Sequence, residues 1–179
     1  MSILPLIYAP NPIFKIKAEP VADINDDIIK LVDDMFSTMY TEKAVGLGAN
    51  MVGILKRIAV VDLQDSNTKS PFTFINPVIT WRSENRQTYK EASLCFPGIS
   101  AEINRPSVIK IKYFDCNGKA QELKAEGFLS AVIQHEVDYL DGITFLDYLS
   151  NMKRDMLLRK VKKHIKKYPP RIHDEHFYH

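Results

Sequence analysis

Residues 128–140, FLSAVIQHEVDYL, constrain the fold of this chain more than any other stretch. Apolar side chains would cover nearly every side of a helix built from this stretch, which is typical of a helix enclosed by the rest of its domain. The middle of the stretch nevertheless carries His135, Glu136 and Asp138. Burying ionisable groups is costly unless they are hydrogen-bonded, paired or bound to a metal. The sequence therefore predicts a buried helix whose polar side chains are either satisfied by their surroundings or take part in chemistry.

His135 and Tyr139 are four residues apart and share one face of this helix, with Glu136 beside them. A histidine at position 139 would complete the pattern H-E-x-x-H, which places two metal ligands around a general base. Residue 139 is a tyrosine, so the pattern is HExxY. Whether a metal binds here therefore depends on whether Tyr139 can act as a ligand.

The length and composition indicate a single globular domain, residues 1–179, that is large enough to bury a core. The net charge of +2 is too small to indicate a nucleic-acid partner by itself. Cys95 and Cys116 are too few for a disulfide framework, which favours a reducing compartment. The N-terminus lacks the pattern of a secretory signal, and no apolar run approaches the ~20 residues of a membrane span. We expect a cytoplasmic protein without membrane contact.

Alternating and β-branched residues predict strands at 57–62, 71–80 and 108–114. The sequence DCNGK at 115–119 predicts a hairpin turn, because asparagine followed by glycine tolerates positive φ, and residues 121–124 begin the return strand. Strands therefore fill the middle of the chain and helices flank them. This order favours an α+β fold in which antiparallel β-sheets surround the central helix that carries HExxY, with a further helix at the C-terminus.

Residues 23–40 predict an amphipathic helix with Asp23 as its N-cap. Gly142 is placed to end the central helix. The glycine-rich segment 44–53 indicates a tight structural corner, because it lacks the lysine and Ser/Thr of a phosphate loop. Residues 93–99 are predicted to start in an extended conformation, before a Pro-Gly pair ends it.

Residues 151–168 predict a C-terminal helix with a narrow apolar stripe and a basic outer face. Such a face suits contact with RNA or the ribosome, although a lysine-rich helix that only aids solubility fits at least as well. Its basic residues are Lys153, Arg154, Arg159, Lys160, Lys162, Lys163, Lys166 and Lys167. Residues 169–179 are expected to be a flexible tail, in which His173, His176 and His179 would come together only in a helix.

Three short segments carry the pattern of one family. Residues 44–51 read AVGLGANM, residues 91–95 read EASLC and residues 134–139 read QHEVDY. They resemble the three motifs of the peptide deformylase family, G-x-G-x-A-A-x-Q, E-G-C-L-S and Q-H-E-x-D-H. The resemblance extends over roughly residues 11–148. It implies that family's α+β fold and its activity, removal of the formyl group from the N-terminal methionine of nascent chains.

In that family, the second-motif cysteine and both third-motif histidines bind a divalent metal, commonly iron. The glutamate acts as base and acid on the metal-bound water, and the glutamine and a backbone N–H hold the oxyanion. The resemblance therefore implies that Glu136 is catalytic and that Leu47 and Leu94 are catalytic backbone positions. It also implies that His135 is a metal ligand.

The remaining motif positions depart from the family: Ser93 replaces the cysteine, Tyr139 the second histidine and Met51 the glutamine. A serine hydroxyl and a phenol of pKa ≈ 10 keep their protons near neutral pH, whereas metal ligands must be deprotonated. We therefore expect no cofactor, or a divalent iron or zinc ion if the protein is active. Loss of one oxyanion donor alone typically costs on the order of 10² to 10³ in turnover. The sequence thus predicts a deformylase-like protein whose deformylation is impaired or absent.

We expect Tyr139 to fill the metal's space, with its hydroxyl bonded to His135, Glu136 or Ser93. Such a protein could persist as a module that binds formylated or methionyl N-termini of nascent chains, or as a ribosome-associated factor. Phe128 and Val132 share a face with His135 and are candidates for a methionine-sized pocket.

Two alternatives stay open. The first is an active but atypical deformylase that uses His135, Glu136 and Cys95. Residues 93 and 95 of an extended strand face the same side, so a two-residue register slip would deliver the thiol of Cys95 in place of Ser93. The second is a purely structural or regulatory homologue that binds another partner.

Overall fold

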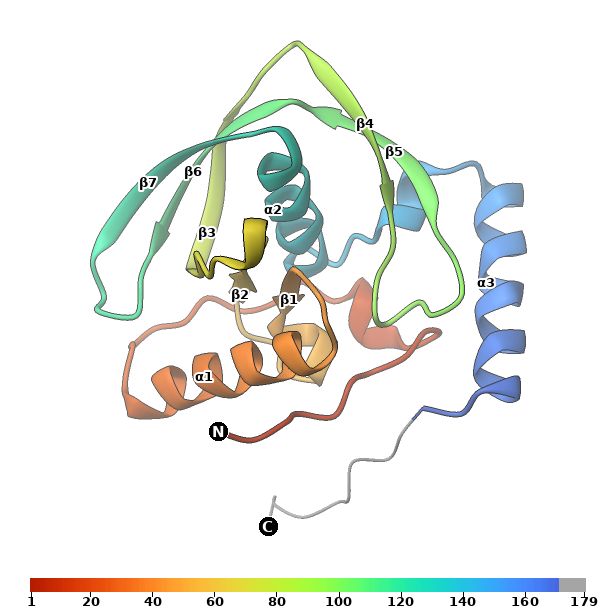
Figure 1. The fold of residues 1–179 in the computed structure, drawn as a ribbon, viewed down its shortest axis with the longest axis horizontal. Coiled ribbons are helices and arrows are strands. Elements are labelled where there is room, and N and C mark those ends of the chain that lie inside the picture. The colour runs from red at the N-terminus through yellow and green to blue at the C-terminus, as the bar shows by residue number, and fades with distance from the viewer. Residues whose placement is uncertain (171–179) are drawn as a thin grey trace.

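The computed structural model describes residues 1–170, which form two antiparallel sheets and three α-helices (Figure 1). The larger sheet has the strand order β1-β2-β3-β6-β7, and the smaller sheet pairs β4 with β5. The strands are β1 (Gly46–Gly48), β2 (Ile58–Val61), β3 (Phe72–Arg82), β4 (Arg86–Glu91), β5 (Ala101–Pro106), β6 (Val108–Phe114) and β7 (Ala120–Glu126). The helices are α1 (Asp26–Thr41), α2 (Gly127–Leu140) and α3 (Asn151–Lys167). Every strand pairing is antiparallel, so the predicted α+β class is confirmed.

Helix α2 lies under the arch that the strands form, and it contributes to two separate hydrophobic clusters (Figure 1). Val132, Ile133 and Val137 pack with residues of β2, β3, β6 and β7. Tyr139 belongs instead to the cluster that contains Val32 of α1. A helix between two cores needs apolar side chains on nearly every side, which is the physical reason for the pattern at residues 128–140.

The strands predicted at 57–62, 71–80 and 108–114 correspond to β2, β3 and β6. The hairpin turn after β6 is also present: Gly118 has φ of 71°, and the Asp115 carboxylate accepts hydrogen bonds from backbone N–H groups within the turn. The glycine-rich corner contains β1 and a 3-10 turn, Ala49–Val52, which ends at Gly53 with φ of 83°. The sequence therefore located β2, β3, β6 and β7 of the larger sheet and the hairpin turn, but it predicted a corner and no strand at β1.

Helix α1 begins later than predicted. Its N-cap is Asn25, whose side-chain oxygen accepts a hydrogen bond from the N–H of Ile28 at 3.1 Å, so the assignment of Asp23 was wrong. The stretch DINDD offers several capping oxygens, and local sequence does not decide among them. The helix that follows this cap buries Ile28, Val32 and Met35.

The prediction of an extended start at residues 93–99 was also wrong. Leu94 and Cys95 lie in a turn, and the N–H of Phe96 donates to the carbonyl oxygen of Ser93 at 3.1 Å. Gly98 follows with φ of 80°, a conformation that favours glycine. This segment therefore folds back on itself directly after β4.

The smaller sheet was not predicted. Strand β4 reads RQTYKE and has no apolar alternation, and β5 reads AEINRP. Ala101, Ile103 and Arg105 of β5 point inward, so an arginine occupies one of the three inward positions and hides the pattern. Periodicity methods count an arginine as an outward residue, which explains the omission.

The C-terminal helix has the predicted position and polarity: α3 buries Leu157 and Val161 and exposes most of its basic residues. Gly142 follows α2 with φ of 75°, where an added Cβ would lie 2.8 Å from the backbone of Lys15. The histidines predicted in the tail, His173, His176 and His179, lie outside the described residues. Within residues 1–170, none of the helices is both long enough and apolar enough to span a membrane.

Candidate functional site

A cavity of about 530 Å³ lies beside α2, and its wall includes residues from all three motif segments. Phe128 and Val132, the residues predicted to line a methionine-sized pocket, form part of this wall. The motif residues in the wall include Gly46, Met51, Glu91, Ser93, Leu94, His135 and Glu136. Leu47, the other predicted backbone position, is buried in β1 and is not part of the wall. The fold thus brings the three segments together around one space.

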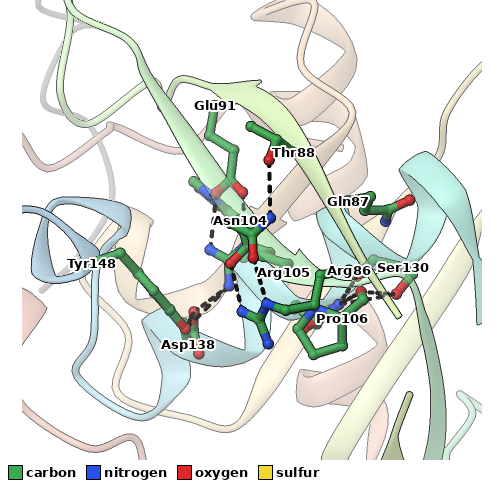
Figure 2. A network of polar contacts seen from close by, with 12 residues as sticks. Arg86, Gln87, Thr88, Glu91, Asn104, Arg105, Pro106, Ser130, Asp138 and Tyr148 are labelled. Carbon is green, nitrogen blue, oxygen red and sulfur yellow. Dashed lines mark hydrogen bonds and ion pairs between the residues drawn. The ribbon is translucent and has the colours of Figure 1, made fainter. Parts of the chain in front are cut away.

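The imidazole of His135 is held by a network of paired charges. Its Nδ1 lies 2.8 Å from Oε1 of Glu91, the residue that ends β4. Two nitrogens of Arg105 donate to the two carboxylate oxygens of Glu91 at 2.6 and 2.9 Å. A third Arg105 nitrogen donates to Asp138 at 2.7 Å, and the hydroxyl of Tyr148 donates to the same carboxylate at 2.7 Å (Figure 2).

This network sets the protonation of its members. Burial acts to raise the pKa of Glu91, but the hydrogen bonds from His135 and Arg105 hold that pKa below its usual value. The ionised carboxylate can only accept, so the Nδ1–H of His135 is the donor and Nε2 is the ring nitrogen directed elsewhere. Sequence reasoning gave no role to Glu91 and missed Arg105 entirely. The only signal for Arg105 was its inward place in the alternation of β5.

Glu136 is buried against the glycine corner. A Cβ at Gly46 would lie 2.7 Å from its Oε1, so this close approach requires glycine. Burial, together with the charge of Glu91, raises the pKa of Glu136 to about 7 against the opposing effect of His135. Its Oε2 is buried and has no hydrogen-bond partner among the described residues, and the same is true of Oδ1 of Asn50. Gly48 lies next to both unpaired oxygens: a Cβ added to this glycine would come within 3.6 Å of each of them.

Tyr139 fills space at the base of α2. Its side chain is 0% exposed, and its hydroxyl donates to Oγ of Ser93 at 2.7 Å. The ring packs edge-on against Phe14 and Phe96. Burial raises the pKa of the phenol well above its ordinary value, so the hydroxyl keeps its proton. The expectation that this hydroxyl bonds to one of three named side chains is confirmed for Ser93.

Met51 stands where the family has glutamine. The side chain is buried, and its sulfur accepts a hydrogen bond from the N–H of Gly48 at 3.3 Å. A thioether has no hydrogen to donate. The wall of the cavity at this position therefore offers no side-chain donor.

Cys95, the proposed substitute ligand, lies in the hydrophobic core and not in the cavity wall. Its N–H donates to Oγ of Ser93 at 3.3 Å, and its thiol lies 3.9 Å from the carbonyl oxygen of Met51. Burial raises the pKa of the thiol well above its usual value. Because residues 94 and 95 form a turn, the register slip that would exchange Ser93 for Cys95 has no extended strand in which to occur.

The donor set at the three family ligand positions does not suit a divalent metal ion. Ser93 and Tyr139 present protonated hydroxyls bonded to each other, so His135 is the one family ligand position that still carries an imidazole. Iron and zinc require deprotonated ligands. Within residues 1–170, no group of three or more His, Cys, Asp or Glu side chains is arranged to hold a metal ion.

In this antiparallel α+β fold, the central helix and two other chain segments enclose a cavity whose wall includes the buried pair His135 and Glu136. The family model for polypeptide deformylase matches residues 3–155, and the chain belongs to the peptide deformylase family. This family removes the N-formyl group from nascent peptides and depends on a metal.

Comparison with individual proteins separates two kinds of relative. The chain is 60% identical to a "Peptide deformylase-like" protein of Rickettsia conorii, over 94% of this chain and 92% of the relative. It is 46% identical to "Peptide deformylase 1" of the same organism, over 91% of this chain and 97% of the relative. The crystal structure of peptide deformylase from Ehrlichia chaffeensis superposes with a TM-score of 0.88 at 37% identity, and covers 93% of this chain and 98% of its own.

Proposed function

We propose that this chain is a deformylase-family protein that binds peptide amino termini in the cavity beside α2 and has lost ordinary metal-dependent deformylation. The observation that carries the proposal is the 2.7 Å hydrogen bond from Tyr139 to Ser93. These two residues occupy two of the three positions that hold the metal in the family, and each satisfies the other. A metal would have to break this bond and remove two tightly held protons.

The cavity itself supports the binding of a peptide amino terminus. It retains about 530 Å³, within the usual range for small-molecule sites, and combines apolar walls with convergent polar groups. Phe128 and Val132 supply apolar surface for a methionine side chain, and the ring of Tyr89 lies 5.5 Å from that of Phe128. The imidazole of His135 is held by Glu91.

The proposed loss of deformylation has two independent causes. Without the ion there is no activated water, because lowering the pKa of that water is the metal's contribution. Without the glutamine there is one donor fewer for a developing oxyanion, and Met51 cannot replace it. Glu136 remains as an acid–base group next to the cavity, but it has no metal-bound water to act on.

The direct test combines metal analysis with an activity assay. Protein purified anaerobically should contain far less than one equivalent of iron or zinc, and should release no formate from a formyl-methionyl peptide. Peptide deformylase 1 of Rickettsia conorii, prepared in parallel, is the matched positive control. Stoichiometric metal together with turnover would instead favour the atypical deformylase.

A binding titration tests the other half of the proposal. Isothermal titration of the metal-free protein with methionyl and formyl-methionyl peptides should give saturable binding to the wild type. Phe128→Ala should weaken this binding, because it removes apolar surface from the cavity wall. Absence of measurable affinity for both peptides would eliminate the binding module and leave a structural or regulatory homologue.

A second proposal concerns α3. Its exposed basic residues form a face opposite the buried Leu157 and Val161, whereas Arg154 is half-buried and lies 3.6 Å from Asp147. We propose that this basic face contacts RNA, with the ribosome as the natural source near nascent chains. The exposed basic residues are Lys153, Arg159, Lys160, Lys162, Lys163, Lys166 and Lys167.

The RNA proposal is tested by the salt dependence of binding. Fluorescence anisotropy with a ribosomal RNA fragment should show affinity that falls as salt rises. The double variant Lys160→Glu, Lys163→Glu should reduce the slope of log K against log salt by about 1.4 for a single strand. Binding that is absent, or that is unchanged in the double variant, would leave α3 as a solubilising helix.

A further inference from the structure

We propose that the outer face of the larger sheet binds single-stranded nucleic acid. This face belongs to β3, β6 and β7, and it is the side of these strands that points away from α2 (Figure 1). The inner side is covered, because Ile109, Ile111 and Ala125 pack with residues of α2 in one hydrophobic cluster. The proposed surface uses no residue of the cavity or of α3.

The strand register arranges the side chains of the outer face in rows. From β3 to β7 the two central rows are Trp81, Lys110, Lys124 and Val78, Lys112, Glu122. Side chains paired across antiparallel strands point to the same side of a sheet. All six are exposed, whereas Ile109 and Ile111, which alternate with the lysines of β6, are buried. The face therefore combines apolar and charged side chains, and all of them are open to solvent.

A bulge in β3 gives this face two large apolar side chains. Val78 and Trp81 are three residues apart, so in a regular strand they would point to opposite sides. The register shift between Ile79 and Trp81 brings Trp81 to the outer side, while Ile79 packs against the inner cluster. Val78 is 58% exposed and Trp81 is 47% exposed. Bulges commonly redirect a side chain next to a functional site, which makes the indole a candidate contact.

Lys110 places an unpaired positive charge beside this indole. The other two lysines of the rows each form an ion pair with a glutamate of β7, at 4.0 and 3.2 Å. Within residues 1–170, the ammonium of Lys110 has no carboxylate within 4.0 Å, and it lies 5.9 Å from the centre of the Trp81 ring. A nucleotide carries the two complementary groups, a base that stacks on an aromatic ring and a phosphate that binds an ammonium. This juxtaposition favours nucleic acid over a protein partner.

Phe114 adds a second aromatic side chain to the same face. It is 41% exposed, and it alternates along β6 with Lys110 and Lys112, so all three point outward. Four residues of a strand span about 13 Å, so the two rings lie in separate rows and can each contact a different base. Sheets that bind single-stranded RNA use two or three exposed aromatic side chains in this way. Stacking requires unpaired bases with accessible faces, which favours a single strand over a duplex.

The sole tryptophan of the chain, Trp81, reports directly on this face. The full-length protein is titrated with an oligouridylate of about eight nucleotides, a length within the site sizes of single-strand-binding folds, in low salt. Tryptophan fluorescence should be quenched saturably as bases stack on the indole, and the affinity should fall as salt rises. The α3 variant Lys160→Glu, Lys163→Glu is the control and should still show this quenching.

Variants of the face are measured in the background of that α3 variant, so that α3 does not contribute to binding. Anisotropy of a labelled oligouridylate should show that Trp81→Ala weakens binding by about fivefold or more, the effect of losing one stacked base. Lys110→Gln should reduce the slope of log K against log salt by about 0.7. Lys17→Gln removes an exposed lysine outside the sheet and should leave this slope unchanged.

Thermal unfolding checks that each variant is folded, as expected for exposed positions. Absence of quenching, or binding that folded Trp81→Ala keeps in full, would overturn the proposal. Sedimentation velocity of the free protein tests the other occupant of such a face. Self-association that Trp81→Ala abolishes would assign the face to a second copy of this chain and would also overturn the proposal.

Discussion

The polar network around His135 and the pair formed by Ser93 and Tyr139 meet the cost of burial in different ways. In the network Arg105 is 2% exposed and forms ion pairs with two carboxylates, so each carboxylate has a cationic partner. In the pair, two neutral hydroxyls share one hydrogen bond and no charge is buried. Removing one member of a buried charge network leaves an uncompensated charge, whereas neutral groups can be exchanged at small cost.

This difference corresponds to which motif positions depart from the family in this chain. The residues that depart from the family, Ser93, Tyr139 and Met51, are those whose replacements are neutral and satisfied locally. The network that orients His135 is coupled to the fold through β4, β5 and α2.

The largest effect is expected from restoring the family residues. The triple variant Met51→Gln, Ser93→Cys, Tyr139→His should change metal content from substoichiometric to about one equivalent, because His135 is already oriented by Glu91. Metal analysis after anaerobic reconstitution measures this. The single variant Met51→Gln is the control and should bind no metal. If the folded triple variant also fails, the geometry around the pair has moved and the contrast is too simple.

Within the network, Arg105→Met should destabilise the protein by about 3–5 kcal/mol, because Glu91 and Asp138 would be buried without a cation. Urea unfolding measures the loss. Arg154→Met is the matched control: its ion pair with Asp147 is 3.6 Å long and partly exposed, so the loss should stay below about 1 kcal/mol. Equal losses in the two variants would show that the network contributes no more than a surface ion pair.

Glu136 should make stability depend on pH. Its pKa is raised to about 7 in the folded protein from 4.5, so between these values the folded state binds more protons than the unfolded state. Stability from this group is therefore highest below about pH 4.5 and is lost as pH rises towards 7, by on the order of 3 kcal/mol. Urea midpoints from pH 5 to 8 should show this loss in the wild type and not in Glu136→Gln. Parallel pH profiles for the two proteins would mean that Glu136 is solvated and not buried.

The sequence predicted the parts of this structure that depend on local pattern. Helix α2 was recognisable because two clusters need apolar residues all around it, and the turn at residues 115–119 because its chemistry is local. Strand β5 and the role of Arg105 were not recognisable, because an inward arginine is stabilised only by partners distant in sequence, Glu91 and Asp138. Cys95 was a candidate ligand only while residues 93–95 were assumed to be extended.

The smallest effect is expected from Tyr139→Phe, which removes one neutral hydrogen bond and no packing. Ser93 is half-buried and can turn to water, so the loss of stability should be about 1 kcal/mol in urea unfolding. Tyr113→Phe is the control, because the hydroxyl of Tyr113 has no hydrogen bond within residues 1–170, and its loss should be close to zero. Metal content should be equally low in the wild type and in Tyr139→Phe, since a neutral phenol contributes nothing to binding an ion. If the wild type carries iron and Tyr139→Phe loses it, Tyr139 is a metal ligand. Ser93 and Tyr139 would then be a working part of the metal site and not a neutral replacement for it.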